Sequence, residues 1–582
     1  MKRLQGIPVS PGFVMGKALV LHGGSHFEIP FRKVEKESIS HEIARFEDAI
    51  TRTRAEILGI RKRLTAQMGR EHSDIFNAHL LILEDRTMIE DVIAQIKEQC
   101  ASADSAFSAV MQRYFQAFSN IGDEYLRERV ADIRDVGRRL LQNLGGEEKP
   151  SLDNLKEDVI LIAHDLSPSD TATMNKERVL AFVTEVGGPT SHTAILGRSL
   201  EIPAVVGVDK VTLHVNTGDR VAVDGAHGIL IVNPDEKAIE EATQRERRFT
   251  ELETELDKLK ELPAETPDGH RIKLAANIEF HDEIPSVISH GADGIGLYRT
   301  EYFYLNRRDL PTEDEQYEAY CQVARKMKPH EVIVRTLDLG GDKFLSSLDV
   351  PHEMNPFLGW RAIRFCLTRT DIFKAQLRAI LRASIEGNLK IMYPMISNVN
   401  EIKRANELLA ECRTELKNEG KPFDPNIEVG AMIEIPSAAL TSDILAREVN
   451  FFSIGTNDLI QYALAVDRVN EKIAYLYEPM HPAILKLIKM VVDNGHAAQR
   501  WVGCCGEMAG DPEAAVLLMG LGIDEISASP IALPKVKKII RSILFSDAQR
   551  IAVQALEFHT GSEVQHYVRE EIRKLAPELI EE

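Results

Sequence analysis

The feature that most constrains the fold is a regular alternation of strand-like and helical segments after Pro267. Eight strand-like runs follow one another there, and most of the gaps between them carry helical patterns. Such alternation favours a parallel sheet, and eight units favour a closed (β/α)₈ barrel. A doubly wound open sheet is the competing architecture, and the count of eight favours the barrel. The predicted strands are 272–278, 294–300, 332–338, 389–395, 427–434, 451–458, 501–507 and 525–530.

Unusual polar residues stand at the C-terminal ends of five of these strands. A barrel of this type builds its active site at that end, from the loops that follow the strands. Each residue alone is more readily explained as an ion pair or a helix cap, but five such endings point to a site. The predicted residues of this barrel mouth are Arg299, Arg335, Glu434, Asn457, Asp458 and Cys505, with Arg361 and Arg468 in nearby loops.

These residue types suit a small, multiply charged anion together with a metal ion. Arginines clamp phosphate and carboxylate groups through paired N–H donors. Glu434 and Asp458 offer hard oxygen ligands, and two carboxylates with substrate oxygens and water suit octahedral Mg²⁺. The Asn457 amide can donate to a phosphate oxygen.

Cys505 is the outlier among the mouth residues. A thiol of ordinary pKa is mostly protonated at neutral pH and can act as a general acid toward an enolate carbon. The alternative is a small buried apolar residue, which is what most free cysteines are. Because side chains alternate along a strand, the neighbouring Cys504 points to the other side and is predicted to be a packing residue.

The first part of the chain reads as a strand-rich domain interrupted by helices. Residues 34–145 carry an amphipathic helical stripe and contain no proline. We expect the N-terminal strands to join the later ones in one sheet, with the helical part inserted between them. Residues 236–262 read as a charged connecting helix. The predicted strands lie within 7–21 and at 159–163, 179–183, 204–207, 220–223 and 229–232.

A glycine-rich segment, 187–194, places His192 after a strand-like run and at the start of a predicted helix. Glycines let the backbone approach a ligand, and a helix start offers unpaired N–H groups that favour a phosphate. A neutral imidazole there could attack phosphorus and then hold the phosphoryl group. A buried, hydrogen-bonded histidine in a capped helix is the alternative, and the segment alone does not separate the two.

The amino-acid composition narrows the classes of function that we expect for this protein. The formal net charge of -20 disfavours non-specific nucleic-acid binding and suits a basic protein partner. The six cysteines show no zinc-binding spacing and fit a reducing cytosol. The N-terminus lacks a signal-peptide core and no apolar run is long enough to span a membrane, so we expect a cytoplasmic protein.

Together these motifs resemble enzyme I of the bacterial phosphoenolpyruvate:sugar phosphotransferase system over essentially the full length. The motifs lie at 10–12, 187–192, 296–301, 335–336, 340–343, 355–361, 455–459 and 505–507. The resemblance implies a multidomain α/β protein that ends in a (β/α)₈ TIM barrel, which binds phosphoenolpyruvate and forms a homodimer. The implied domains are an α/β phosphohistidine (swivelling) domain at 1–24 and 146–235, an inserted all-helical HPr-binding subdomain at 25–145, a linker helix at 236–262 and the barrel at 263–582.

The resemblance also implies an activity, that of a phosphoenolpyruvate–protein phosphotransferase. Phosphoenolpyruvate would bind with Mg²⁺ and phosphorylate His192, which would pass the group to a histidine of the carrier protein HPr in sugar uptake. Cys505 would donate the proton that converts the enolate to pyruvate. Glu434 and Asp458 would hold the metal, and the substrate would contact Arg299, Arg335, Arg361, Asn457, Asp458 and Arg468.

Four positions depart from the family's usual pattern: Pro189, Gly197, Val469 and Cys504. Pro189 removes a backbone donor close to His192, but none of the four removes a named catalytic group. Two alternatives stay open: a regulatory phosphorelay without sugar permeases, and a catalytically silent phosphoenolpyruvate-binding scaffold. The intact set of acceptor, metal ligands and proton donor argues against the scaffold.

Overall fold

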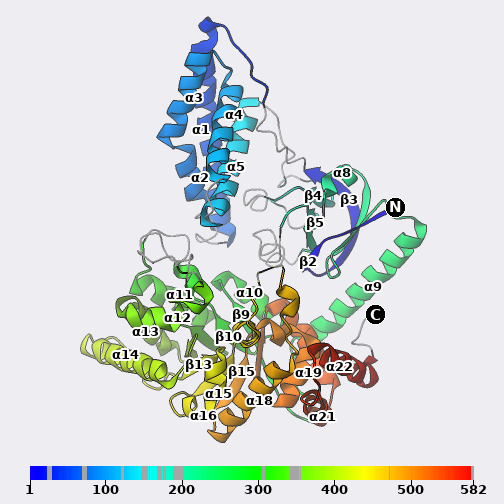
Figure 1. Cartoon of the computed structure of the whole chain (residues 1–582), viewed down its shortest axis with the longest axis vertical. Coiled ribbons are helices and arrows are strands. Elements are labelled where there is room, and N and C mark those ends of the chain that lie inside the picture. The colour runs from blue at the N-terminus through cyan, green and yellow to red at the C-terminus, as the bar shows by residue number, and fades with distance from the viewer. Residues whose placement is uncertain are drawn as a thin grey trace. The chain divides into compact units, whose positions relative to one another are not determined.

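The protein divides into two compact units, Met1–Leu252 and Glu253–Glu582 (Figure 1). The computed structural model describes residues 1–21, 29–68, 75–119, 124–145, 152, 155, 157–166, 174, 178–187, 202–304, 309–340, 353, 355–468, 470 and 472–577. His192 and the departures at Pro189, Gly197 and Val469 lie outside these residues.

An elongated bundle of helices forms part of the first unit (Figure 1). Its core is made of apolar side chains at helical spacing, among them Phe46, Ile57 and Ile60 on the first helix. The Asp85 side chain begins the third helix by accepting the backbone N–H of Met88 at 2.8 Å. The helices are α1 (Ile39–Met68), α2 (Ile75–Leu83), α3 (Arg86–Gln99), α4 (Ala103–Ser119) and α5 (Glu124–Gly145).

The first unit also contains an eight-stranded sheet of order β1-β8-β7-β3-β4-β5-β6-β2. Strand β3 precedes the helical bundle in sequence and β4 follows it, yet the two pair in parallel, which confirms that the N-terminal strands join the later ones. The sequence analysis missed β1, which is short and largely polar and shows no apolar alternation. The strands are β1 (Lys2–Gln5), β2 (Ile7–Ser10), β3 (Phe13–Leu21), β4 (Val159–Ala163), β5 (Val179–Thr184), β6 (Ala204–Val206), β7 (Arg220–Asp224) and β8 (Ile229–Val232).

The second unit is a closed barrel of eight parallel strands, as the sequence predicted. Every predicted strand is present. The first ends at Ile278 as expected, whereas the other seven end one to four residues earlier, so most of the polar endings lie just beyond the sheet. The strands are β9 (Lys273–Ile278), β10 (Gly294–Tyr298), β11 (Glu331–Arg335), β12 (Leu389–Tyr393), β13 (Val429–Ile433), β14 (Phe451–Ile454), β15 (Trp501–Cys504) and β16 (Glu525–Ala528).

Helices surround the barrel strands, and α9 (Glu236–Leu259) precedes the first of them (Figure 1). Among the described helices, none combines the length and the apolar character that a membrane span requires. All six cysteines of the chain are described, and all are free. The longer barrel helices are α11 (Glu313–Met327), α13 (Thr370–Ala383), α14 (Val399–Asn418), α18 (Pro482–Ala497), α19 (Pro512–Leu521), α20 (Leu533–Ser542), α21 (Phe545–Ala555) and α22 (Gly561–Leu575).

Charged and aromatic side chains close the N-terminal end of the barrel. The ammonium groups of Lys273 and Lys390 lie 2.5 and 3.0 Å from the carboxylate of Glu331. Beside them the rings of Phe451 and Trp501 stack with their centroids 4.5 Å apart, and Lys390 lies 5.0 Å from the Trp501 ring. This end is filled by partnered groups, which is typical of the stabilising end of such barrels.

Candidate active site

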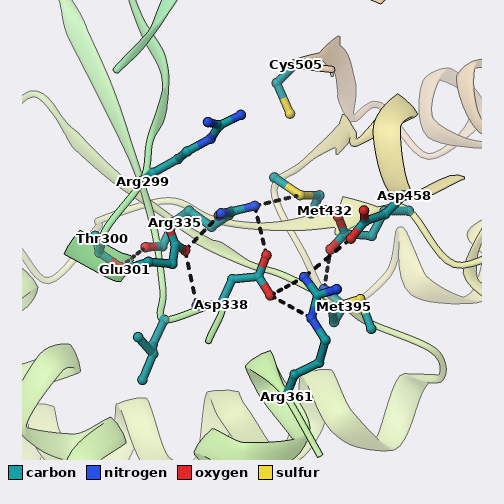
Figure 2. Close-up of polar contacts among 12 residues, drawn as sticks. Arg299, Thr300, Glu301, Arg335, Asp338, Arg361, Met395, Met432, Asp458 and Cys505 are labelled. Carbon is teal, nitrogen blue, oxygen red and sulfur yellow. Dashed lines mark hydrogen bonds and ion pairs between the residues drawn. The ribbon is translucent and has the colours of Figure 1, made fainter. Parts of the chain in front are cut away.

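The predicted residues of the barrel gather at the C-terminal ends of its strands. Arg299 follows β10, Arg335 ends β11, Glu434 follows β13 and Cys505 follows β15. Asp458 lies in the first turn of α17 (Thr456–Leu464), which begins after β14. Figure 2 shows Arg299, Arg335, Asp458 and Cys505 gathered in one region. Strands far apart in sequence therefore deliver their end residues to one site.

Asp338 lies between two arginines at the centre of this site (Figure 2). Its Oδ2 is 3.0 Å from Nη1 of Arg335, and its Oδ1 is 2.7 Å from Nη2 of Arg361. The same Nη2 of Arg361 is 3.4 Å from Oδ2 of Asp458. Burial alone would raise the pKa of Asp338, but the two arginines outweigh it and hold that pKa below its ordinary value. An ionic chain of alternating sign thus runs from Arg335 to Asp458.

A second carboxylate fixes Arg335. Oε1 of Glu301 accepts from Nη2 of Arg335 at 2.8 Å and from the backbone N–H of Asp338 at 3.2 Å. The hydroxyl of Thr300 donates to the Arg335 carbonyl at 2.8 Å. Nε of Arg335 is buried and has no hydrogen-bond partner among the described residues. A guanidinium held in this way keeps one orientation, and its buried Nε donor is left unsatisfied by the described residues.

Glu434 is a deeply buried carboxylate with a backbone cradle. Its side chain is almost fully buried, and Oε1 accepts the backbone N–H of Met395 at 2.5 Å. Gly455 passes so close that a Cβ there would lie 2.8 Å from Oε2 of Glu434. Burial, followed by repulsion from Asp458 and Asp338, raises the pKa of Glu434 to about 8. The ionised form of Glu434 is therefore unfavourable unless a cation binds beside it.

Asn457 and Arg468 are joined through an exposed carboxylate. Nδ2 of Asn457 donates to Oε1 of Glu507 at 3.1 Å, and the Glu507 backbone N–H donates back to Oδ1 of Asn457 at 2.7 Å. Nη1 of Arg468 lies 3.4 Å from the same Oε1. The sequence analysis placed both residues in the site, and the structure brings them together at its exposed side.

Cys505 lies inside the barrel and Cys504 lies outside it, as the alternation of the strand predicted. Cys505 packs in the interior cluster with Leu297, Met432 and others, whereas Cys504 belongs to the core between the strands and the helices. Burial raises the pKa of the Cys505 thiol to about 11. The thiol points to the side of the site where Arg299 and Arg335 lie (Figure 2), so a protonated donor faces the cationic groups.

Arg299 stands apart from the central ionic chain. It forms an ion pair with Glu279, which follows β9, and about a third of its side chain is exposed. The sequence analysis gave no role to Asp338, Glu301 or Glu507. Each of them lies within three residues of a predicted site residue and belongs to the polar strand endings that predicted the site, although the sequence did not say what it does there.

Comparisons with known proteins identify the family of this chain. Three family models match: "PEP-utilising enzyme, N-terminal" at residues 5–129, "mobile domain" at 155–228 and "PEP-binding domain" at 253–545. A phosphoenolpyruvate-protein phosphotransferase of Haemophilus influenzae is 47% identical over 567 residues, which cover 97% of this chain and 98% of that protein. The chain belongs to this family. The resemblance drawn from the sequence motifs is thus confirmed, and the protein is an enzyme.

Other phosphoenolpyruvate-protein phosphotransferases match equally fully. The protein of Staphylococcus carnosus is 46% identical over 572 residues, covering 98% of this chain and 99% of that protein. A solved NMR structure described as Enzyme I (nEIt) is 45% identical and covers 42% of this chain and 99% of its own, with a TM-score of 0.37. The family assignment rests on the full-length sequence matches. Within the family, the match to the PEP-binding domain coincides with the barrel, and the match to the mobile domain includes His192.

Proposed function

We propose that this phosphoenolpyruvate–protein phosphotransferase moves the phosphoryl group of phosphoenolpyruvate to its own His192, releases pyruvate, and passes the group to a histidine of an HPr-type carrier as the first step of sugar uptake. The observation that carries the proposal is the ionic chain from Arg335 through Asp338 and Arg361 to Asp458. It lies at the mouth of a barrel that matches a PEP-binding domain.

The arginines are the groups that would bind the substrate. Phosphoryl transfer needs exact placement and charge neutralisation more than covalent work by the protein. Arg335 and Arg361 are held by carboxylates, so they lose little side-chain freedom when an anion binds. Arg299, Asn457 and Arg468 would complete the contacts from the more exposed side of the site.

Glu434 and Asp458 would hold Mg²⁺. Among the described residues, no cluster of three or more metal-binding side chains exists, so the protein offers two carboxylates and leaves other positions for substrate and water. That donor set fits Mg²⁺, which is commonly bound by one or two carboxylates together with substrate phosphate. The costly negative charge at Glu434 fits a cation as well. When bound, the ion would neutralise charge on the phosphoryl oxygens.

His192 and Cys505 would share the chemistry. The imidazole forms a bond to phosphorus while the bond from phosphorus to the enol oxygen breaks, which leaves the enolate of pyruvate. The Cys505 thiol gives its proton to the methylene carbon of the enolate, and pyruvate leaves. The resulting thiolate regains a proton from solvent. The raised pKa of the thiol keeps the donor protonated before this step.

The domain division predicted from the sequence belongs to the same proposal. The phosphohistidine domain (1–24 and 146–235) would carry the group between the barrel and the carrier, which would dock on the helical subdomain (25–145). Helix α9 would connect it to the barrel domain, through which a homodimer would form in the cytoplasm. The match of a mobile-domain family at 155–228 supports a moving phosphohistidine domain.

Incubation of the purified protein with ³²P-labelled phosphoenolpyruvate and Mg²⁺ tests the proposal. Acid-labile label on the peptide that contains His192, with release of one pyruvate for each label, is the expected result. Binding of phosphoenolpyruvate without any label would overturn the transfer reaction and favour the scaffold alternative.

Replacing Glu434 with glutamine should raise the Mg²⁺ concentration for half-maximal activity by at least about tenfold, since a charged oxygen ligand is lost while the shape is kept. Activity titrated with Mg²⁺ measures this shift. Glu428→Gln is the matched control, because Glu428 lies just before the same strand and pairs with Lys390 at the opposite end of the barrel. A Glu434→Gln enzyme with an unchanged Mg²⁺ requirement would place the metal elsewhere.

Replacing Asp338 with asparagine should raise the KM for phosphoenolpyruvate by about tenfold or more and lower the melting temperature. Two buried guanidinium groups lose their shared anion, and breaking buried pairs costs about 3–5 kcal/mol. Steady-state kinetics and thermal melting measure the two effects. Asp371→Asn is the control, because its pair with Arg369 lies at the surface, where such pairs contribute little. A KM equal to that of the wild type would show that Asp338 does not orient the arginines.

A further inference from the structure

Lys537 is a charged side chain buried in the barrel unit, and the proposed reaction does not use it. It lies on α20, and 1% of its surface is exposed. Its ammonium group donates to the backbone carbonyls of Lys260 at 2.9 Å and Gly291 at 2.8 Å. Burial lowers the pKa of this amine. Because lysine is seldom buried without partners for its donors, these two carbonyls account for its position.

Both carbonyls lie at the junction between α9 and the barrel. Lys260 directly follows Leu259, the last residue of α9. The backbone at Gly291 has a φ of +68°, and a Cβ there would lie 2.1 Å from the Lys260 carbonyl oxygen. The two loops therefore touch at a position that requires glycine, and Lys537 bridges them.

Two further side chains of α20 hold the same junction. Nη1 of Arg541 donates to the carbonyl of Pro263 at 2.7 Å. Nζ of Lys538 lies 2.9 Å from the carboxylate of Glu255 near the end of α9. Cations near the C-terminal end of a helix also interact favourably with its unpaired carbonyl groups. One helix of the barrel thus fastens residues 255–263 with three cationic side chains.

Two other observations assign this junction to the barrel. The compact unit that contains the barrel begins at Glu253. The match to the PEP-binding domain also begins at residue 253. Both boundaries fall inside α9 and upstream of every residue that α20 holds, so the last part of α9 belongs to the barrel body.

We propose that Lys537 and Arg541 are positioning residues for the phosphorylation of His192: they fix the end of α9 to the barrel, so that the mobile domain pivots upstream of Glu253 and not at the junction. This inference rests on the proposed function, in which His192 reaches the barrel mouth from another domain. Attack on phosphorus requires the imidazole to lie within about 3–3.5 Å of it in a defined direction. A second pivot would spread the positions of His192 and reduce the aligned fraction.

Loss of Lys537 should affect the two half-reactions differently. Phosphorylation of His192 needs the fixed junction, because acceptor and substrate sit on opposite sides of it along the chain. Transfer from phosphorylated His192 to the carrier does not use the barrel mouth and should not depend on Lys537. Misplacement far from the reacting atoms can slow a reaction by up to about 100-fold, so an effect of about tenfold on the first half-reaction alone is expected.

The test uses the full-length protein with Lys537→Met, and Lys535→Met as the matched control. Lys535 lies on the same helix and is exposed, so its loss removes the same charge without touching the junction. Rapid-quench measurements give the rate of His192 phosphorylation at saturating phosphoenolpyruvate and the rate of transfer from phosphorylated enzyme to carrier. Hydrogen exchange measures the opening of residues 255–266. Arg541→Gln is a second variant that serves if Lys537→Met does not fold.

Support for the inference is an approximately tenfold slower phosphorylation, with unchanged half-saturation by phosphoenolpyruvate, unchanged transfer to the carrier and faster exchange at 255–266. Phosphorylation at the wild-type rate in a variant whose junction exchanges faster would overturn it, and so would equal slowing of both half-reactions. If the wild type and Lys535→Met are not labelled at all, the proposed function itself fails. That result is distinct from a labelled wild type with an unaffected Lys537→Met.

Discussion

Replacing His192 with alanine is expected to abolish acid-labile phosphorylation while phosphoenolpyruvate still binds. The proposed binding groups Arg335, Arg361, Glu434 and Asp458 all belong to the barrel unit, and position 192 falls in the residue range of the other unit. The acceptor and the binding site are therefore separable by mutation. Deleting a covalent nucleophile commonly costs on the order of 10⁶-fold in rate, so pyruvate release should fall to background.

Labelling with ³²P-phosphoenolpyruvate and calorimetric titration of the same protein measure the two properties. His214→Ala is a suitable control, because His214 is an exposed histidine of the same unit, in the short helix α8 (Val211–His214). It should label at the wild-type rate. Label that persists on His192→Ala would identify a different acceptor.

Replacing Cys505 with alanine is expected to slow turnover by about 10²–10⁴-fold, the usual contribution of a positioned acid. Affinity for phosphoenolpyruvate should change little, because the proposed role of the thiol is to donate a proton and the thiol is uncharged. Cys504→Ala is the matched control, since its side chain lies in the outer core of the barrel. Coupled pyruvate assays and binding titrations give both numbers. Normal turnover in Cys505→Ala would make the thiol a packing residue.

The pH profile offers a second check on Cys505. Burial raises its pKa to about 11. The protonated thiol, which is the form that donates, is present below that pKa and is lost above it. Turnover of the wild type should therefore show no alkaline decline due to this group up to about pH 10. A thiol of ordinary pKa would begin to fail in the mildly alkaline range.

The sequence predicted the barrel because apolar runs of strand length recur eight times between helical patterns, and the closed sheet confirms them. Seven of the eight ends were placed too late. Polar residues just beyond the paired segments were counted as strand: Asp338 follows β11, and Glu507 begins a short 3₁₀ helix after β15. The polar endings could still be recognised, because they lie at or just beyond the last paired residue of each strand.

The contacts that hold the site residues in place could not be predicted from the sequence. The hydrogen bond from Met395 to Glu434 joins residues from two different strand ends. Asp338 pairs with Arg361 as well as Arg335 only because the loop that carries Arg361 packs beside it. Lys537 reads as one more cation on an amphipathic helix, and only the fold places it on the carbonyls of Lys260 and Gly291. Contacts of this kind arise from tertiary packing and leave no local pattern.

The position of Trp501 at the N-terminal end of the barrel has a consequence for fluorescence measurements. The chain contains two tryptophans. Trp501 stacks on Phe451 at the N-terminal end of the barrel, and Trp360 directly precedes Arg361 at the other end. Intrinsic tryptophan emission of the whole enzyme therefore originates in the barrel alone. Melting of the mobile domain or the helical bundle would be silent in that signal, and a Trp360→Phe variant would leave one emitter that reports the integrity of the barrel far from the substrate.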